Sequence, residues 1–202
     1  MRLIDPSVVL SYLGKDTSTD NAAAATSAIE MATASIEARL STTLAAGTAQ
    51  DTMMVTNSRL VGAAYMSTLL ASKGFIKTGT VTASRALAVS SFGTDDATTL
   101  TELVINYDKG ILTETATNLT GLFVRLEYQY GFAADVDGLY QGTPDWLKEA
   151  CKILAVLTLI AGPNPIITEK DDVVTPPRAL VTQYETIMAQ AIRYAPGAAL
   201  AI

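Results

Sequence analysis

The pattern of apolar positions over residues 143–162 predicts one helix that the rest of the chain surrounds. From residue 153 to 160 the sequence is apolar on nearly every side. Such a pattern is typical of a helix that is buried on every side. The apolar run has about a dozen residues, short of the roughly 20 needed to span a bilayer. We therefore expect a core helix over 143–161, with Leu154 and Leu157 buried in it, and no membrane-spanning segment.

Both ends of this helix carry the residues that mark helix termini. At the start, Thr143 suits the N-cap, Pro144 suits the first turn, and the charge of Asp145 favours the positive end of the helix. At the other end, Gly162 and Pro163 stop a helix.

Helical spacing predicts two helices before the core helix. A short one lies between Asp5, which caps it ahead of a proline, and Gly14. A long one begins at a cap at Asp20 or Asn21 and reaches about Leu44. The expected buried residues are Val9, Leu10 and Leu13 in the short helix, and Ala25, Ile29, Ala32, Ile36, Leu40 and Leu44 in the long one.

The C-terminal part of the sequence predicts a last helix followed by an apolar tail. The helix runs from Arg178 to about Tyr194, and its apolar residues recur at helical spacing. The tail over 195–202 has no charged side chain. The apolar stripe of the helix consists of Leu180, Tyr184, Ile187, Met188 and Ala191.

Residues 46–132 have a different texture, rich in Thr, Val, Ser and Gly, with short alternating runs that predict strands. The clearest is 122–130, in which apolar and polar residues alternate, as in a half-buried strand. A glycine turn around 108–110 joins two strand ends. The segment 59–72 stays open between a strand and a short helix. The expected strands are 53–57, 65–72, 80–89, 102–107 and 122–130.

Together these elements predict the α+β class. About four helices form a helical body around the core helix, and an antiparallel β block is inserted into it. We divide the chain into N-terminal helices (1–45), a β-rich insertion (46–132), the core and C-terminal helices of the same helical domain (143–194), and the apolar tail (195–202).

Composition and charge narrow the class of partner. Charged residues make up 17% of the 202 residues, and the net charge is −6. A surface this poor in charge suits contact with other protein, although a Ser/Thr/Ala-rich surface in water is the alternative. No run of Lys and Arg provides the basic face that gripping nucleic acid requires. No signal peptide is recognisable at the N-terminus, so synthesis and folding in the cytoplasm are expected.

The residue types needed for catalysis and metal binding are scarce. The chain has no histidine, which removes the commonest general base and most zinc sites. The acidic pairs Asp95/Asp96 and Asp171/Asp172 are expected in solvated loops. Cys151 lacks a histidine partner and lies in the core helix, where it acts as a small hydrophobe. We expect no enzyme activity, no cofactor and no metal.

Two stretches, VRLEYQYGF and TPDWLKEACKILAVLTLIAG, resemble the closing half of the head–tail connector (adaptor) proteins of tailed bacteriophages. In that family a final strand ends in Tyr-x-x-Gly-Tyr/Phe and leads through a loop to a Pro-Asp/Glu-x-Leu-Lys-x-Ala helix. The two N-terminal helices and the YDKGIL turn are also similar. The matching residues are Tyr128, Gly131, Phe132, Pro144, Asp145, Leu147, Lys148 and Ala150.

The resemblance covers about residues 1–44 and 105–161 and implies a structural role. Such proteins form a ring, typically of twelve copies, which docks under the portal protein and leads to a downstream neck or tail protein. DNA passes through the ring without specific binding, and the family has no catalytic residues. The implied location is the neck of a virion assembled in a host cytoplasm. The β block over 46–104 is larger than in small family members, and 163–202 has no counterpart.

Three other interpretations stay open. The chain could be another tail-completion or minor capsid structural protein, a histidine-free enzyme that uses carboxylates or a metal, or an unassigned binding module. For the connector interpretation, we expect the C-terminal segment to contact the portal or a neighbouring subunit, with Tyr194, Leu200 and Ile202 as contact residues. The alternative is that the tail folds back on its own core.

Overall fold

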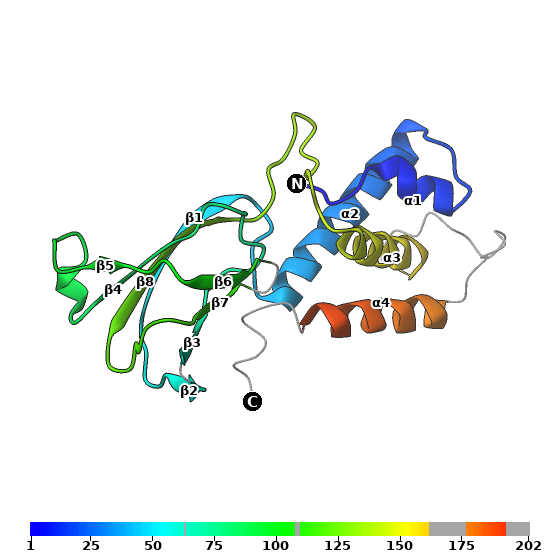
Figure 1. The fold of residues 1–202 in the computed structure, drawn as a ribbon. Coiled ribbons are helices and arrows are strands. Elements are labelled where there is room, and N and C mark those ends of the chain that lie inside the picture. Colours follow the sequence, from blue (N-terminus) through cyan, green and yellow to red (C-terminus); the bar gives the residue numbers. More distant parts are fainter. Residues whose placement is uncertain (63, 108–109, 162–176, 193–202) are drawn as a thin grey trace. The chain divides into compact units, whose positions relative to one another are not determined.

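The computed structural model describes residues 1–62, 64–107, 110–161 and 177–192. These form two compact units (Figure 1). The helical unit contains residues 1–41 and 132–192, and the β unit contains residues 42–131. The two units contain helices and antiparallel sheets respectively, so the expected α+β class is confirmed.

The helical unit has four helices in its described residues, and α3 packs against each of the others. Asp5 caps α1 as expected, since its Oδ1 accepts a 2.8 Å hydrogen bond from the N–H of Ser7. Val9 and Leu10 are buried, whereas Leu13, expected on the buried face, is partly exposed. The helices are α1 (Pro6–Tyr12), α2 (Thr19–Leu40), α3 (Asp145–Ala161) and α4 (Pro177–Ile192).

The expected ends of α2 were wrong at both termini. Ser18 occupies the N-cap position, and Asp20 lies in the first turn, where its charge favours the helix. Asn21 does not cap the helix, because its side-chain amide donates a 2.6 Å hydrogen bond to Oδ1 of Asp16. At the other end Ser41 adopts a left-handed conformation with φ of 50° and stops the helix before Leu44.

The start of α3 also differs from the expectation. The carbonyl of Pro144 accepts hydrogen bonds from the N–H groups of Leu147 and Lys148, so Pro144 occupies the cap position. Thr143 lies one residue earlier, and its hydroxyl is buried without a hydrogen-bond partner. The assignment of Thr143 as the N-cap was therefore wrong.

The core helix is buried on most sides, but not on all. Leu154 and Leu157, expected to be buried, are partly exposed. They fall at helical spacing on one strip with Ala161, which is exposed. Among the described residues the neighbouring helices cover the remaining sides of α3. Its buried residues are Leu147, Ala150, Cys151, Ile153, Ala155, Val156 and Leu159.

The β unit consists of two four-stranded antiparallel sheets within its described residues. Their strand orders are β1-β8-β4-β5 and β2-β3-β7-β6. The strands are β1 (Gly47–Met54), β2 (Arg59–Val61), β3 (Ala64–Leu70), β4 (Thr82–Ala86), β5 (Thr98–Thr99), β6 (Leu103–Asn106), β7 (Ile111–Glu114) and β8 (Phe123–Tyr130).

Side chains from both sheets meet in one apolar core. Leu69 and Leu112 come from one sheet, and Val124 and Leu126 from the other; all four are fully buried. The alternation expected in 122–130 is confirmed, since Val124, Leu126 and Tyr128 are buried while Glu127 is exposed.

Other strand assignments needed correction. The segment that stayed open between strand and helix contains the strands β2 and β3. The strand expected at 53–57 instead occupies Gly47–Met54, and the two-residue strand β5 was not expected. The two strand ends expected around 108–110 are confirmed, because β6 pairs with β7 and Asn106 lies opposite Ile111, whereas residues 108 and 109 of the expected turn lie outside the described residues.

Candidate partner-binding surface

The three residues expected to contact a partner, Tyr194, Leu200 and Ile202, lie outside the described residues. So do Ala191's side chain and the acidic pair Asp171/Asp172. The candidate surfaces below therefore consist of described residues alone.

The residues considered for catalysis are placed as structural or solvated groups. Cys151 is buried between α3 and α2, 3.8 Å from the hydroxyl of Thr33, and burial raises the pKa of its thiol to about 11. Asp95 and Asp96 are exposed in a loop. In the described part of the chain, no group of three or more Cys, Asp or Glu residues is placed to hold a metal ion. No described helix has the length and hydropathy to cross a membrane.

The Tyr-x-x-Gly-Phe motif ends the last strand of the β unit. Tyr128 is buried, and its hydroxyl donates a 2.6 Å hydrogen bond to Oδ2 of Asp51 on β1. The same hydroxyl accepts a 3.1 Å hydrogen bond from the N–H of Lys73. The carboxylate of Asp51 also accepts from the N–H and the hydroxyl of Ser72, at 2.7 and 2.6 Å. The motif tyrosine thus fixes the segment after β3 to β1, the edge strand of the sheet β1-β8-β4-β5.

The motif glycine has a defined structural role. Gly131 has φ of +74°, a conformation that favours glycine. A Cβ atom at this position would come within 2.4 Å of the carbonyl oxygen of Ala45. Its N–H donates a 2.9 Å hydrogen bond to the carbonyl of Phe75. Only glycine fits this point, at which the chain leaves the β unit.

The loop between the motif and α3 is held by one carboxylate. Oδ1 of Asp135 accepts hydrogen bonds from the N–H groups of Asp137 and Leu139, at 3.0 and 2.9 Å, and Oδ2 accepts from the side chain of Gln141 at 2.8 Å. Val136, at the tip of this loop, is fully exposed. The loop therefore presents an apolar side chain to solvent on an ordered backbone.

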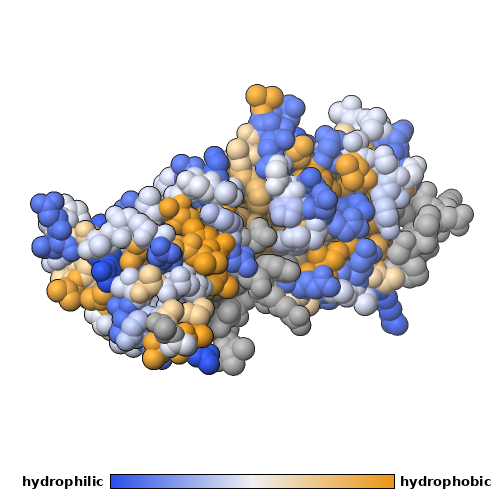
Figure 2. Space-filling view, in the orientation of Figure 1, coloured by the Kyte–Doolittle hydropathy of each residue, from blue (hydrophilic) through white to orange (hydrophobic). Residues whose placement is uncertain are grey.

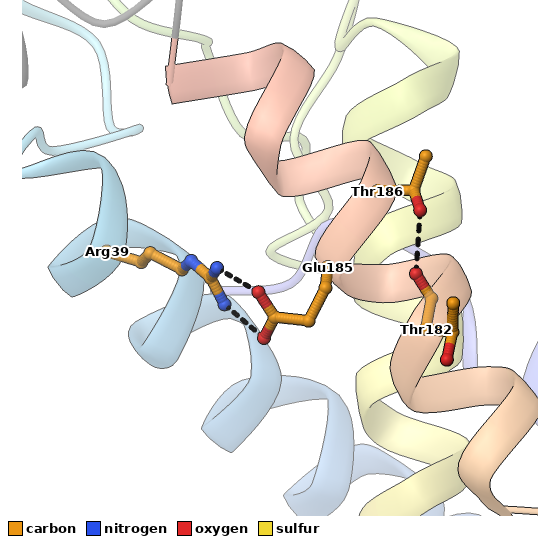
Figure 3. Close-up of polar contacts among 4 residues, drawn as sticks. All are labelled: Arg39, Thr182, Glu185 and Thr186. Carbon is orange, nitrogen blue, oxygen red and sulfur yellow. Dashed lines mark hydrogen bonds and ion pairs between the residues drawn. The ribbon is translucent and has the colours of Figure 1, made fainter.

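In the helical unit, one arginine joins α2 to α4. The guanidinium of Arg39 forms a two-point ion pair with the carboxylate of Glu185, and one of its bonds, Nη1 to Oε1, is 2.8 Å long (Figure 3). The Arg39 guanidinium also lies 5.3 Å from the ring centre of Tyr184. The hydrogen bonds from Arg39 lower the pKa of the Glu185 carboxyl. The expected stripe of α4 is confirmed at its buried members Leu180, Tyr184 and Met188.

Several exposed apolar side chains of the β unit lie on the two faces of the β2–β3 hairpin. All three residues of β2 and the first three of β3 are exposed. Arg59 is the only charged residue between positions 52 and 72. Figure 2 shows hydrophobic surface on the β unit. We define the hairpin surface as Leu60, Val61, Tyr65 and Met66, which are 59, 47, 37 and 38% exposed.

A second surface lies at the opposite end of the same sheet. An open groove of about 760 Å³ runs beside β6. Val104, on β6, is 65% exposed. We define the β6 groove by Thr78, Val104, Ile105, Asn106, Tyr107, Ile111 and Thr113.

Sequence reasoning missed both surfaces. The hairpin sequence has four large apolar residues and a single charge, but this composition does not distinguish exposed from buried positions. Periodicity did not resolve it, because 59–72 fitted a strand and a short helix equally well. The exposure of Val104 depends on β6 being the last strand of its sheet, and strand order is not readable from one sequence.

Comparison with protein families and with curated protein sequences finds no match. Among the solved structures that match, two are aligned over 91% of this chain and 88% of the matched chain, each with a TM-score of 0.44. One, at 18% identity, is described as the neck of an empty GTA particle computed with C6 symmetry. The other, at 19% identity, is described as the virion of a native gene transfer agent (GTA) particle.

Proposed function

We propose that the chain is a structural neck protein, a head–tail connector that forms a ring on the portal of a tailed-phage-like particle. In this role it links the DNA-filled head to a downstream neck or tail protein, and DNA passes through the ring. The chain acts by holding partners in place rather than by chemistry.

The observation that carries this proposal is the structural use of the connector-like motif. Tyr128 locks the last strand to Asp51, and Gly131 occupies a point where only glycine fits. An ordered loop then leads to Pro144 and to α3, which packs against the other three helices. Each quoted part of the motif thus has a defined place between a β unit and the central helix of a helical unit.

Surface properties support an assembly role. Exposed apolar side chains lie on the hairpin at one end of the sheet β2-β3-β7-β6, and Val104 lies at the other end, where contact with other protein would bury them. The net charge of −6 disfavours a grip on passing DNA. An electrophoretic shift of duplex DNA by the isolated protein at physiological salt would oppose this interpretation.

The direct experiment is co-expression with the portal protein encoded in the same genome. We expect the two proteins to co-purify, and electron microscopy to show a ring of this chain on the portal. The isolated protein can stay monomeric, because docking on the portal can be the step that starts assembly. A chain that neither binds the portal nor forms rings in its presence would overturn the proposal.

For the contact with the portal or a neighbouring subunit we propose the C-terminal segment 194–202, with Tyr194, Leu200 and Ile202 as anchors. The segment has no charged side chain, and burial of apolar surface in a partner is worth about 25 cal/mol per Å². Deleting residues 195–202 should leave the melting temperature unchanged and abolish binding to the portal. Normal binding, or loss of the fold, would contradict the proposed anchor.

A further inference from the structure

The sheet β2-β3-β7-β6 has two edges, with Leu60 and Val61 exposed on β2 and Val104 exposed on β6. Within the described residues β2 pairs only with β3, and β6 pairs only with β7. Unpaired strand edges are templates for pairing with another chain. The two edges can pair with each other only if their hydrogen-bond phase, sheet face and strand direction agree.

The hydrogen-bond phase of β6 can be read from its pairing with β7. The N–H of Thr115 donates a 3.3 Å hydrogen bond to the carbonyl of Glu102, just before β6. Because successive residues of a strand direct their N–H and C=O groups to opposite sides, alternate residues of β6 bond to β7. Ile105 therefore directs its N–H and C=O to the outer side of β6, beside the β6 groove. Tyr107 has the same phase, and its carbonyl accepts a 3.0 Å hydrogen bond from the N–H of Ile76, so the open edge ends at Asn106.

The phase of β2 follows in the same way from the other end of the sheet. The N–H of Ala71 donates a 2.9 Å hydrogen bond to the carbonyl of Gly110 across the β3–β7 pair. Carried through β3, this alternation places the N–H and C=O of Leu60 on the outer side of β2. Ser58 has the same phase, and its N–H donates a 3.0 Å hydrogen bond to Oγ1 of Thr120, so the open edge begins at Arg59. Leu60 lies opposite Tyr65 within the hairpin.

The sheet face and the strand direction of β2 and β6 are also compatible with pairing. The register places Leu60 and Ile105 on the same face of the sheet, the face on which Leu69 and Leu112 are buried. Every neighbouring pair in this sheet is antiparallel. If a second copy continues the sheet with the same face inward, its β2 therefore lies antiparallel to β6.

We propose that β2 of one copy pairs with β6 of the next copy, with Leu60 opposite Ile105, so that one sheet continues across the subunit boundary. This assignment places Val61 opposite Val104, which are 47 and 65% exposed in one chain. A shift by two residues would keep the phase but place Val61 opposite Glu102 in one direction and opposite Asn106 in the other, so apolar matching selects the first register. The interface rests on the proposed ring, and identifies the surface through which its copies meet.

The two edges belong to different surfaces of the chain, so the contact is head-to-tail. Such a contact leaves one β2 edge and one β6 edge open after each addition, and the chain of copies ends only when it closes into a ring. The charge is compatible, because the hairpin carries only Arg59 in its segment while the whole chain has a net charge of −6.

Disulfide trapping tests the pairing. Directly opposite residues of antiparallel strands have Cβ atoms about 4.5–5.5 Å apart, near enough to be trapped as a disulfide. We expect a chain with both Val61→Cys and Val104→Cys, assembled with the portal and oxidised, to give a ladder of multimers on a non-reducing gel. An equal mixture of the two single variants should give dimers and no larger species. The native Cys151 is buried and should not contribute.

The controls separate this interface from other contacts. Val61→Cys combined with Leu87→Cys, an 82% exposed position away from both edges, should give no ladder. Cross-linking of Val61→Cys alone would indicate a symmetric contact and overturn the head-to-tail pairing. Rings on the portal without the Val61–Val104 cross-link would overturn the interface and leave the proposed function intact. A ladder formed by a chain that does not bind the portal would support the interface and overturn the proposed function.

Discussion

The hydroxyl of Tyr128 donates a 2.6 Å hydrogen bond to Oδ2 of Asp51, a residue 77 positions earlier in the chain. The carboxylate also accepts two hydrogen bonds from Ser72, so a single acidic side chain joins β1, β8 and the segment that follows β3. The tyrosine of the sequence motif is therefore a structural residue of the β unit, rather than a contact residue.

Replacing Tyr128 with Phe should lower the free energy of unfolding by about 1–2 kcal/mol, because Asp51 loses a donor that water replaces poorly in this partly buried position. Urea denaturation followed by circular dichroism measures the change. Tyr65→Phe, at an exposed position of the hairpin, is the matched control and should have little effect. Equal effects of the two substitutions would contradict the assigned role.

The same tyrosine predicts a pH dependence. Burial and the hydrogen bond to Asp51 raise the pKa of Tyr128 from 10.0 to about 12, so the folded state favours the neutral phenol. This contribution to stability is complete below pH 10 and is lost as the pH rises through 12. We expect the melting temperature of the wild type to fall more steeply over this interval than that of Tyr128→Phe. Parallel curves for the two proteins would refute this.

Two glycines with the same φ of +74° allow the cost of the left-handed conformation to be measured apart from the cost of a steric clash. Gly131 has no room for a Cβ beside the carbonyl of Ala45, whereas Gly138 has no atom within 4 Å of that position. Gly138→Ala should cost about 1–2 kcal/mol for the left-handed conformation alone. Gly131→Ala should cost roughly 1–3 kcal/mol more, because the backbone at Ala45 must move. Thermal melts of the two variants make the comparison, and similar losses would remove the argument for the close approach.

The sequence predicted those elements whose own residues carry a clear marker, such as a proline, a glycine or an apolar alternation. The proline and glycine signals located α1, α3 and the exit at Gly131, and alternation located β8. Strand β1 was displaced, because its sequence GTAQDTMM contains Gly and Asp and its burial alternates only between partly buried and exposed. Its pairing with β8 over eight residues overrides this weak propensity.

The candidate surfaces needed information that no single sequence holds. Leu60 and Val104 are apolar residues in strands, and nothing local distinguishes them from the buried Leu69 or Leu112. Their exposure follows from strand order, which places β2 and β6 at the two ends of the sheet. The helical periodicity of α3 likewise could not say which side its neighbours leave open.

That open side of α3 gives a prediction about stability. Ile153 is 2% exposed, and Ile153→Ala should cost about 2–5 kcal/mol through lost burial and a cavity. Leu154 is partly exposed, and Leu154→Ala should cost about 1 kcal/mol, because less area leaves water on folding. The two variants differ by one position in the same helix, so propensity effects nearly cancel. Equal destabilisation in urea would indicate that Leu154 is buried after all, as the sequence pattern suggested.

The ion pair between Arg39 and Glu185 should respond to both salt and pH. Arg39 and Glu185 have side chains that are 31 and 53% exposed, so screening by salt is effective. The hydrogen bonds from Arg39 hold the pKa of Glu185 below its ordinary value of 4.5, so the stabilisation is present above that pH and is lost as the pH falls through the lowered value. Glu185→Gln should therefore lower the melting temperature at pH 7 in low salt. The difference from the wild type should shrink in about 1 M salt, where the screening length is about 3 Å, and below the pKa. A difference that persists unchanged in high salt and at low pH would show that the side chain of Glu185 acts through packing and that the charge of Arg39 is not what attaches α4 to α2.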